Sequence, residues 1–446
     1  MNTHAIPAAR TGAQDYLAGK GAAWFAYAMT VALMLMDYID RQVIVSLFPY
    51  MKNEWGLSDV QLGSLVSVVS VTVALGALPV ALFADRVSRV RSIAAMAAVW
   101  SAATLSCMFM RSYGALLAAR SLVGLGEAGY GSVGAALIAS HFPERMRGAL
   151  LAGFFACASV GSVLGVVLGG AIAAHWGWKA AFGVVGVPGL VLAALYLLVR
   201  DYRTVRLTPV LTQATRSSAH AARHVTQSLT RSRTLLWVCI GGAAQLVVVS
   251  AVWSWMPSFL NRVHGVAPEQ AARQAALVVL CGALGSVVWG AVADRAGKRR
   301  PVARLQAMAL MCVASLAVLS FAFGAGAGFG AQGQLALIAL GSFLMTCTVG
   351  PVAAIVIDVV HPGVRATGSS VLALFQNLFG LALGPVLAGT VSDLWGLQAA
   401  LACIPCFALA AAAAFLAAAR TYVEDMGRAS EAPAAPLPHA LRTAQA

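Results

Sequence analysis

Two apolar stretches of the chain carry ionisable side chains at helical spacing. Asp37, Asp40 and Arg41 lie at positions i, i+3 and i+4 of one stretch, so a helix would place all three on one face. Arg120 and Glu127 lie seven residues apart in another stretch, again on one helix face. The set holds three carboxylates and two guanidiniums. One carboxylate is therefore in excess, which suits a site that takes up and releases a proton.

The elements that hold these side chains must lie in a lipid bilayer. Of the 446 residues, 60% are hydrophobic and 10% are charged, whereas soluble domains average about 45–50% apolar and about 25% charged residues. This composition excludes a water-soluble protein. Ionisable side chains inside a bilayer are costly unless they are paired or wetted, so those five residues are functional candidates. The alternative is a static ion-pair cluster that only holds two helices together.

Twelve apolar runs are long enough to span a bilayer, since about 20 such residues cross it. The predicted spans are 22–48, 59–83, 92–111, 114–140, 149–174, 179–200, 234–261, 270–293, 302–324, 333–360, 368–393 and 397–420. We therefore predict an all-α membrane protein of two six-helix bundles. Its predicted parts are an N-terminal tail (1–21), a first bundle (22–200), a linker (201–233), a second bundle (234–420) and a disordered tail (421–446).

The Lys and Arg residues orient the predicted spans. With both termini in the cytoplasm, 23 of the 30 Lys and Arg residues lie in inside segments and 5 in outside segments, as the positive-inside rule requires. We therefore expect a multi-pass protein of the cell membrane, in particular a bacterial inner membrane, with both termini cytoplasmic. The net charge of +14 follows from this distribution, so no nucleic-acid partner is expected.

The two halves of the chain repeat each other. GALPVALFADRVSRVR at 76–91 aligns with GSVVWGAVADRAGKRR at 285–300, and GSVLGVVLGG at 161–170 aligns with GLALGPVLAG at 380–389. The first pair follows the second span of each half, and the second pair lies within the fifth span. Parallel six-span repeats are a transporter architecture in which the site lies between the halves.

Several of these motifs resemble those of the major facilitator superfamily. The segments 76–91 and 285–300 resemble its G-x-x-x-D-R-x-G-R-R loops, and RSLVGLGEAG from Arg120 resembles its helix 4 motif. MDYIDRQV (36–43) and GEAGYGS (126–132) are similar to spinster-like members, although Asp37 stands where their pattern has Asn. WGWKAAFGVVGVPGL (176–190) fits both the spinster-like members and the anion:cation symporter family.

The resemblance implies a secondary transporter that works by alternating access. We predict proton coupling through Asp40, Glu127 and Asp37. The predicted substrate-binding residues are Arg41, Arg120, Tyr38, Tyr130, Gln245, Trp253, Gln376 and Asn377. The predicted conformational latch, a set of loop charges that holds the cytoplasmic side shut, comprises Asp85, Arg86, Arg89, Asp294, Arg295 and Arg299. Asp358 and Asp393 lie near helix ends and are read as structural.

Three kinds of cargo stay open at this point. The spinster resemblance implies an amphipathic or lipid-like molecule, and the anion:cation resemblance implies a small carboxylate imported by proton symport. Efflux of drugs or metabolites is the third alternative. We expect a monomer whose partners are the small-molecule substrate, protons and the lipid bilayer, with no metal or cofactor. An enzyme is not expected, because no span contains a deeply placed His and the chain has no HExxH motif.

Overall fold

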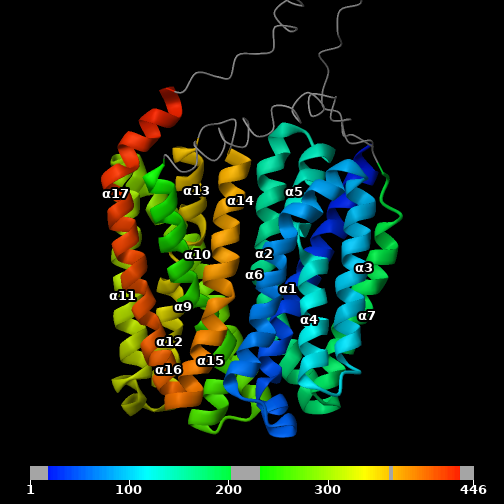
Figure 1. Ribbon diagram of the computed structural model, residues 1–446, viewed down its shortest axis with the longest axis vertical. Helices are drawn as coiled ribbons and strands as arrows, with labels where there is room; N and C mark the ends of the chain where they lie inside the picture. Colours follow the sequence, from blue (N-terminus) through cyan, green and yellow to red (C-terminus); the bar gives the residue numbers. More distant parts are fainter. Residues whose placement is uncertain (1–18, 202–231, 361–364, 432–446) are drawn as a thin grey trace, which may run out of the picture.

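The computed structural model describes residues 19–201, 232–360 and 365–431, which are helical almost throughout. Twelve of the described helical segments are long and apolar enough to cross a membrane, which confirms the predicted number of spans. In Figure 1 they stand side by side along the long axis. The N-terminal half, coloured blue to green, lies on one side, and the C-terminal half, coloured green to red, lies on the other.

The N-terminal half consists of six spans, the fourth of which is divided. Its helices are α1 (Lys20–Trp55), α2 (Asp59–Arg86), α3 (Arg89–Cys107), α4 (Tyr113–Glu127), α5 (Tyr130–His141), α6 (Glu144–Trp176) and α7 (Trp178–Tyr196). Local signals mark the end of α1 and the start of α2, and α1 continues past the predicted end of its span at 48 to Trp55. Gly56 follows α1 with a φ of +62°, and Ser58 begins α2 with a capping box to Gln61.

The C-terminal half repeats this arrangement with more irregular helices. Its elements are α9 (Arg233–His264), α10 (Pro268–Arg299), α11 (Pro301–Phe323), η1 (Ala325–Phe329), α12 (Gly330–Met345), α13 (Val349–Val359), α14 (Arg365–Phe375), η3 (Gln376–Leu381), α15 (Leu383–Trp395), α16 (Leu397–Cys403), η4 (Ile404–Cys406) and α17 (Phe407–Glu431). The fourth span of this half is also divided, between α12 and α13.

Glycines let the fifth span of each half lie against the first span of that half. A Cβ added to Gly165 on α6 would stand 2.6 Å from the carbonyl oxygen of Ile39 on α1. A Cβ added to Gly384 on α15 would stand 2.6 Å from the carbonyl oxygen of Val247 on α9. Small residues at helix contacts in membranes allow this close approach. The aligned glycine motifs therefore make equivalent contacts in both halves.

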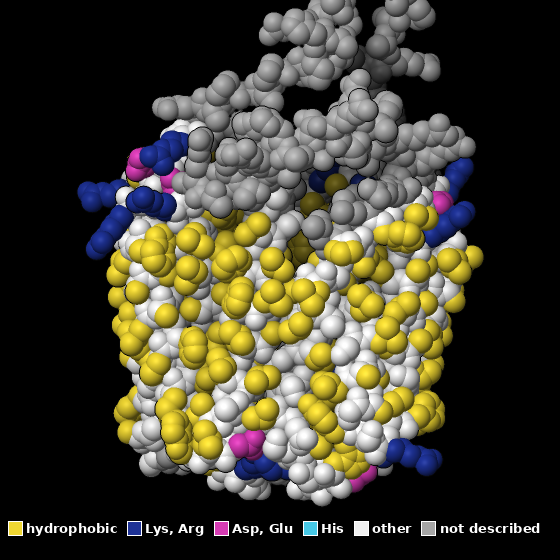
Figure 2. Space-filling view, in the orientation of Figure 1, with side chains coloured by type: hydrophobic (Ala, Val, Ile, Leu, Met, Phe, Trp, Pro, Cys, Tyr) yellow, Lys and Arg dark blue, Asp and Glu magenta, His cyan; other side chains and the backbone are white. Residues whose placement is uncertain are grey.

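Both described ends of the bundle lie on the same side of the molecule, at the top of Figure 1. We call this side the termini side and the opposite side the far side. In Figure 2, apolar side chains cover the middle of the visible face, and charged side chains lie near its two ends. This distribution fits a bilayer around the middle.

The last helix differs from the predicted tail. α17 continues to Glu431, so the expectation of disorder from residue 421 is wrong for 421–431. The cause is a cap: Asp425 is buried, and its carboxylate accepts hydrogen bonds from the backbone N–H of Thr234, at 2.9 Å, and from the Ser232 hydroxyl, at 3.2 Å. The N-terminus of α9 and the C-terminal end of α17 therefore stabilise each other. The tails 1–18 and 432–446 and most of the predicted linker (202–231) lie outside the described residues.

Candidate functional site

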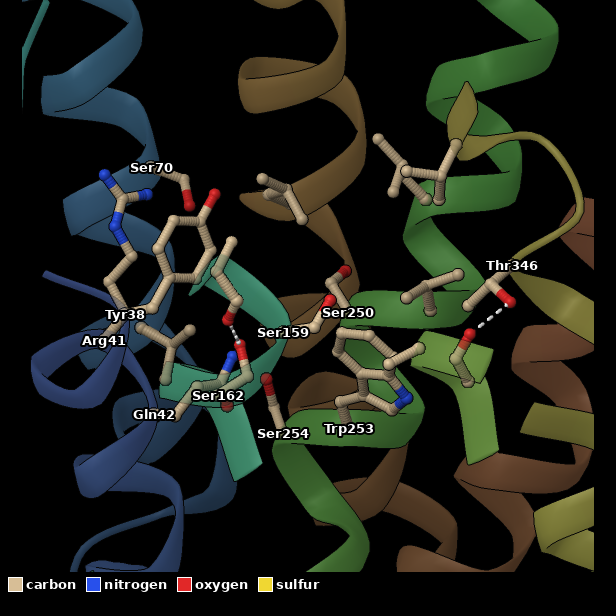
Figure 3. Close-up of a pocket in the computed structure, with 18 of the residues that line it drawn as sticks. Tyr38, Arg41, Gln42, Ser70, Ser159, Ser162, Ser250, Trp253, Ser254 and Thr346 are labelled. Atoms are coloured by element: carbon tan, nitrogen blue, oxygen red, sulfur yellow. Dashed lines mark hydrogen bonds between the residues drawn. The ribbon is translucent and has the colours of Figure 1, made fainter. Parts of the chain in front are cut away.

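A cavity of about 340 Å³ lies between the two halves. Figure 3 shows part of its wall, with Tyr38, Arg41 and Gln42 from the N-terminal half on one side and Trp253 and Thr346 from the C-terminal half on the other. The described lining residues are Tyr38, Arg41, Gln42, Val66, Val69, Ser70, Arg120, Ala158, Ser159, Ser162, Leu246, Val249, Ser250, Trp253, Ser254, Gly282, Ala283, Ser286, Thr346, Val349, Gln376 and Leu381. The site is therefore formed by both repeats, as predicted for this architecture.

The charged side chains among these lining residues are Arg41 and Arg120, both from the N-terminal half. The predicted carboxylates stand behind them. Arg41 Nη2 lies 3.0 Å from Glu127 Oε2, and Arg41 Nε lies 3.3 Å from Asp37 Oδ1. The carboxylates of Asp37 and Glu127 are almost fully buried, while 19% of the Arg41 side chain is exposed. Arg41 thus joins the cavity to two carboxylates that are otherwise enclosed.

A second pair holds the third carboxylate. Arg120 Nη1 lies 3.3 Å from Asp40 Oδ1, and the hydroxyl of Thr104 on α3 donates to Asp40 Oδ2 at 2.6 Å. Both charged side chains are about 1–2% exposed. Two arginines and three carboxylates from α1 and α4 therefore form one buried group, which is the grouping that the sequence predicts. The pairing itself was not predicted, because spacing along one helix does not specify partners on another.

The glycine-rich end of α4 places Glu127 in this group. Gly124 packs so closely on α2 that an added Cβ would stand 2.5 Å from the Val69 carbonyl oxygen, and Gly126 packs equally closely on α3. The helix then ends at Glu127, and Gly129 takes a φ of +81°. Because the carbonyl end of a helix favours a cation, Arg41 is well placed beside Glu127. Interrupted helices within a bilayer are typical of binding sites.

The structure brings together most of the predicted substrate-binding residues. Tyr38, Arg41, Arg120, Trp253 and Gln376 all line the cavity. The ring of Tyr38 also lies under the guanidinium of Arg41, with 5.6 Å between the Cζ atom and the ring centroid. Gln376 begins the π-helical element η3, a form of helix that often occurs at functional sites.

Three predicted substrate-binding residues are not among the described residues that line the cavity. The Tyr130 hydroxyl donates to the Thr30 carbonyl oxygen at 2.6 Å in a fully packed region. Gln245 is completely buried, and its amide donates to the Met345 carbonyl oxygen at 2.9 Å. Asn377 is half-buried, and its side-chain amide donates to the carbonyl oxygen of Ala373, one helical turn earlier. The side chains of these three residues form hydrogen bonds to backbone carbonyl oxygens of the bundle, so a polar residue in an apolar span is not by itself a sign of a binding site.

Six serines among the described lining residues are outside the predicted substrate-binding set. Ser70, Ser159, Ser162, Ser250, Ser254 and Ser286 line the cavity together with Gln42. A signal was present, because Ser159 and Ser162, and likewise Ser250 and Ser254, are spaced by three or four residues on apolar helices. Gln42 also has a buried carbonyl oxygen without a hydrogen-bond partner in the described structure.

An ionic cluster closes the far side of the cavity. Asp59 at the start of α2 binds Lys52 Nζ at 2.5 Å within its own half. It also binds Arg262 Nη1 at 2.7 Å and the Ser392 hydroxyl at 2.5 Å, both from the other half. The Asp59 side chain is 3% exposed. These contacts cross the boundary between the halves, so the far side is shut in this conformation.

Asp393 strengthens the same closure by capping α2. Its two carboxylate oxygens accept the backbone N–H groups of Asp59, at 2.8 Å, and Val60, at 3.0 Å. A carboxylate at a helix N-terminus is stabilising, and here the carboxylate comes from the end of α15 in the other half. The sequence predicts a structural role for Asp393, and its contact joins the two repeats.

Two of the predicted latch residues, Asp294 and Arg89, make contacts within their own halves. Arg304 on α11 bridges Asp294, at 3.2 Å, and Asp358, at 3.0 Å. Arg89 Nη1 donates to the Ser140 hydroxyl at 3.2 Å. The side chains of Asp85 and Arg86 lie outside the described part of the structure, and those of Arg295 and Arg299 are exposed. The role of these loops as a latch stays a prediction.

Comparisons with known proteins agree with this architecture. The family model described as Major Facilitator Superfamily matches residues 30–382. Protein spinster of Drosophila melanogaster is 27% identical over 384 residues, which cover 83% of this chain and 62% of the relative, so the match spans less than two thirds of that protein. The gallate transporter of Pseudomonas putida is 27% identical over 329 residues, covering 67% of this chain and 71% of the relative.

A solved structure has the same fold. It is the crystal structure of a bacterial homologue of the human lysosomal transporter spinster, in an inward-facing and unoccupied conformation. The TM-score is 0.81 at 22% sequence identity, and the match covers 91% of this chain and 99% of the other. The family model covers most of the chain, and the relatives named here are transporters rather than enzymes. This chain therefore belongs to the Major Facilitator Superfamily, and spinster is among the members that it resembles.

Proposed function

We propose that the protein is a proton-coupled secondary transporter of a compact amphipathic organic anion. The observation that carries this proposal is the position of Arg41. Its guanidinium faces the cavity and pairs with the buried carboxylates of Glu127 and Asp37 at its back. An anionic substrate that binds Arg41 therefore competes with these carboxylates for the same cation.

This competition supplies a mechanism for coupling. A carboxylate that loses its cationic partner in an apolar, low-dielectric site is stabilised by taking up a proton. Binding of the anion at Arg41 would thus favour protonation of Glu127, and release of the anion would restore the ion pair. Anion and proton then move in the same direction, which is symport. Asp40, held by Arg120 and Thr104, is the second proposed proton site, and Asp37 is the third.

The cluster on the far side supports an alternating-access mechanism. The halves are joined there through Asp59, Arg262 and Asp393, so substrate would enter this conformation from the termini side. We propose, from the distribution of Lys and Arg, that the termini side is cytoplasmic and that the protein is a monomer in a bacterial inner membrane. Opening of the far side would require these inter-half contacts to break.

Relatives support an anionic substrate, and their names point to two kinds of apolar part, an aromatic ring and a lipid chain. Two are named for gallate and for 4-hydroxybenzoate, and one from Mus musculus is named a sphingosine-1-phosphate transporter. A lipid-like amphipath is therefore the second candidate. Another relative, from Mycolicibacterium smegmatis, is named an efflux pump, so export remains the alternative direction.

The test uses purified protein in liposomes with an imposed pH gradient. We expect a small aromatic or alkyl carboxylate to accumulate only when the gradient is present, and an uncoupler to abolish the accumulation. Single-chain lysophospholipids are measured in parallel by thermal shift. Uptake that ignores the gradient would refute proton coupling, and stabilisation by lysophospholipids alone would favour the lipid-like candidate.

A further inference from the structure

The indole of Trp253 is a fixed aromatic surface in the cavity wall. Trp253 lies on α9, and its indole N–H donates to the Ser342 hydroxyl on α12 at 3.2 Å. The Ser342 hydroxyl is buried and donates to the Val278 carbonyl oxygen on α10 at 2.8 Å. Three helices of the C-terminal half therefore hold the ring in one orientation.

A glycine makes room for the ring. A Cβ added to Gly282 on α10 would stand 2.7 Å from Cζ2 of Trp253 and 2.8 Å from the Ser342 hydroxyl oxygen. No larger residue fits at position 282 without moving the indole. The part of the indole that is not packed against these neighbours lines the cavity, and Figure 3 shows it beside Ser250 and Ser254.

The opposite wall supplies the positive charge of the cavity, and the ring of Tyr38 there lies against Arg41. Arg41 and Arg120 are the charged residues among the described lining positions, and both belong to the N-terminal half. The volume of about 340 Å³ lies at the lower end of the ~300–1,000 Å³ typical of small-molecule sites. The cavity thus offers cations on one wall, a rigid flat ring on the other, and room for a compact molecule between them.

We propose that Trp253 is a specificity-determining residue that stacks on a planar aromatic ring of the substrate while the carboxylate of the substrate binds Arg41. This inference rests on the proposed transport of an organic anion. It adds that the apolar part of the anion is a planar aromatic ring. Aromatic pairs in offset or edge arrangements gain about 0.5–1.5 kcal/mol beyond the burial of their area. A saturated ring or a flexible alkyl chain of equal charge forgoes this gain.

The experiment compares anions that share a charge and differ in shape. Binding of benzoate, cyclohexanecarboxylate and octanoate is measured by calorimetry on the purified full chain. The wild type should bind benzoate about two- to tenfold more tightly than cyclohexanecarboxylate. Trp253→Leu should remove this preference, whereas Trp253→Phe should keep most of it. Ser342→Ala, which frees the indole edge, should reduce the preference while cyclohexanecarboxylate binding stays the same.

The matched control is Trp237→Leu, because Trp237 lies on the same helix and is 39% exposed on the outer surface. This control should leave the preference intact, and thermal unfolding of each variant reports whether it folds. Equal wild-type binding of benzoate and cyclohexanecarboxylate would overturn the inference, as would an equal loss of all three anions in Trp253→Leu. Tighter binding of octanoate than of benzoate would also overturn it. If none of the anions binds to the wild type, the proposed function itself fails.

Discussion

At the scale of single residues, the site depends on one arginine shared between the cavity and two carboxylates. Arg41 is partly exposed, whereas Glu127 and Asp37 are enclosed behind it. A static ion-pair cluster and a coupling site differ in what happens when one charge is removed. In a static cluster the loss appears as lower stability, whereas in a coupling site it appears as a changed response to pH.

The first prediction concerns Glu127→Gln. The amide is neutral at every pH and imitates the protonated carboxyl group, so substrate should still bind and exchange across the membrane. Binding affinity should vary much less with pH than in the wild type, and a pH gradient should drive much less accumulation, because Asp40 and Asp37 are the proposed proton sites that remain. Binding measured across about pH 5–8 for wild type and variant checks this. The control is Glu144→Gln, because the Glu144 side chain is 89% exposed. A wild-type pH profile in Glu127→Gln would show that Glu127 has only a structural role.

The second prediction separates the charge of Asp40 from its packing. Asp40→Asn should fold and lose proton-driven accumulation by at least about tenfold, because the side chain can no longer carry a proton. Thr104→Val removes the hydrogen bond to Asp40 and keeps its charge. That variant should lose about 1.5–3 kcal/mol of stability and retain coupled transport. Full accumulation by Asp40→Asn would exclude Asp40 from the proton pathway.

At the scale of elements, the sequence predicts the spans well and their irregularities poorly. All twelve spans appear in the structure, because long apolar runs in a bilayer have few alternatives to a helix. The break between α12 and α13, the π-helical η3 and the cap from Asp425 to α9 were not predicted. Each depends on partners from distant parts of the chain, and the composition of a single segment carries no information about these partners.

The third prediction tests the glycine contacts that align the repeats. Gly165→Ala would place a Cβ 2.6 Å from the Ile39 carbonyl oxygen, so α6 must move away from α1. We expect a loss of about 1–3 kcal/mol of stability, seen as a lower thermal midpoint. Gly148→Ala is the matched control, since it lies on the same helix with nothing within 4 Å of the added Cβ. It should be neutral or slightly stabilising, and equal midpoints for both variants would contradict the close-packing argument.

At the scale of the whole molecule, the described conformation is shut on the far side. Ion pairs and a carboxylate that caps a helix N-terminus form this closure. Asp393 caps α2 across the boundary between the halves. The predicted latch on the other side relies on Asp85, also a carboxylate at a helix end. Alternating access requires the two closures to compete, so weakening one should populate the conformation closed by the other.

The last prediction tests this competition with a single reporter. Val66 lines the cavity, and a cysteine placed there in a background free of the eight native cysteines reports access from either side to an impermeant thiol reagent. Asp393→Asn should raise labelling from the far side about two- to fivefold, which corresponds to the ~0.3–1 kcal/mol of a charge at a helix terminus. Asp85→Ala should raise labelling from the termini side with little change in substrate affinity.

The control is Asp393→Glu, which keeps the charge and should behave as wild type. A shift in the same direction for Asp393→Asn and Asp85→Ala would show that the two sides are not opposing closures. In a two-state carrier, the side whose closure is weakened opens and the opposite side closes.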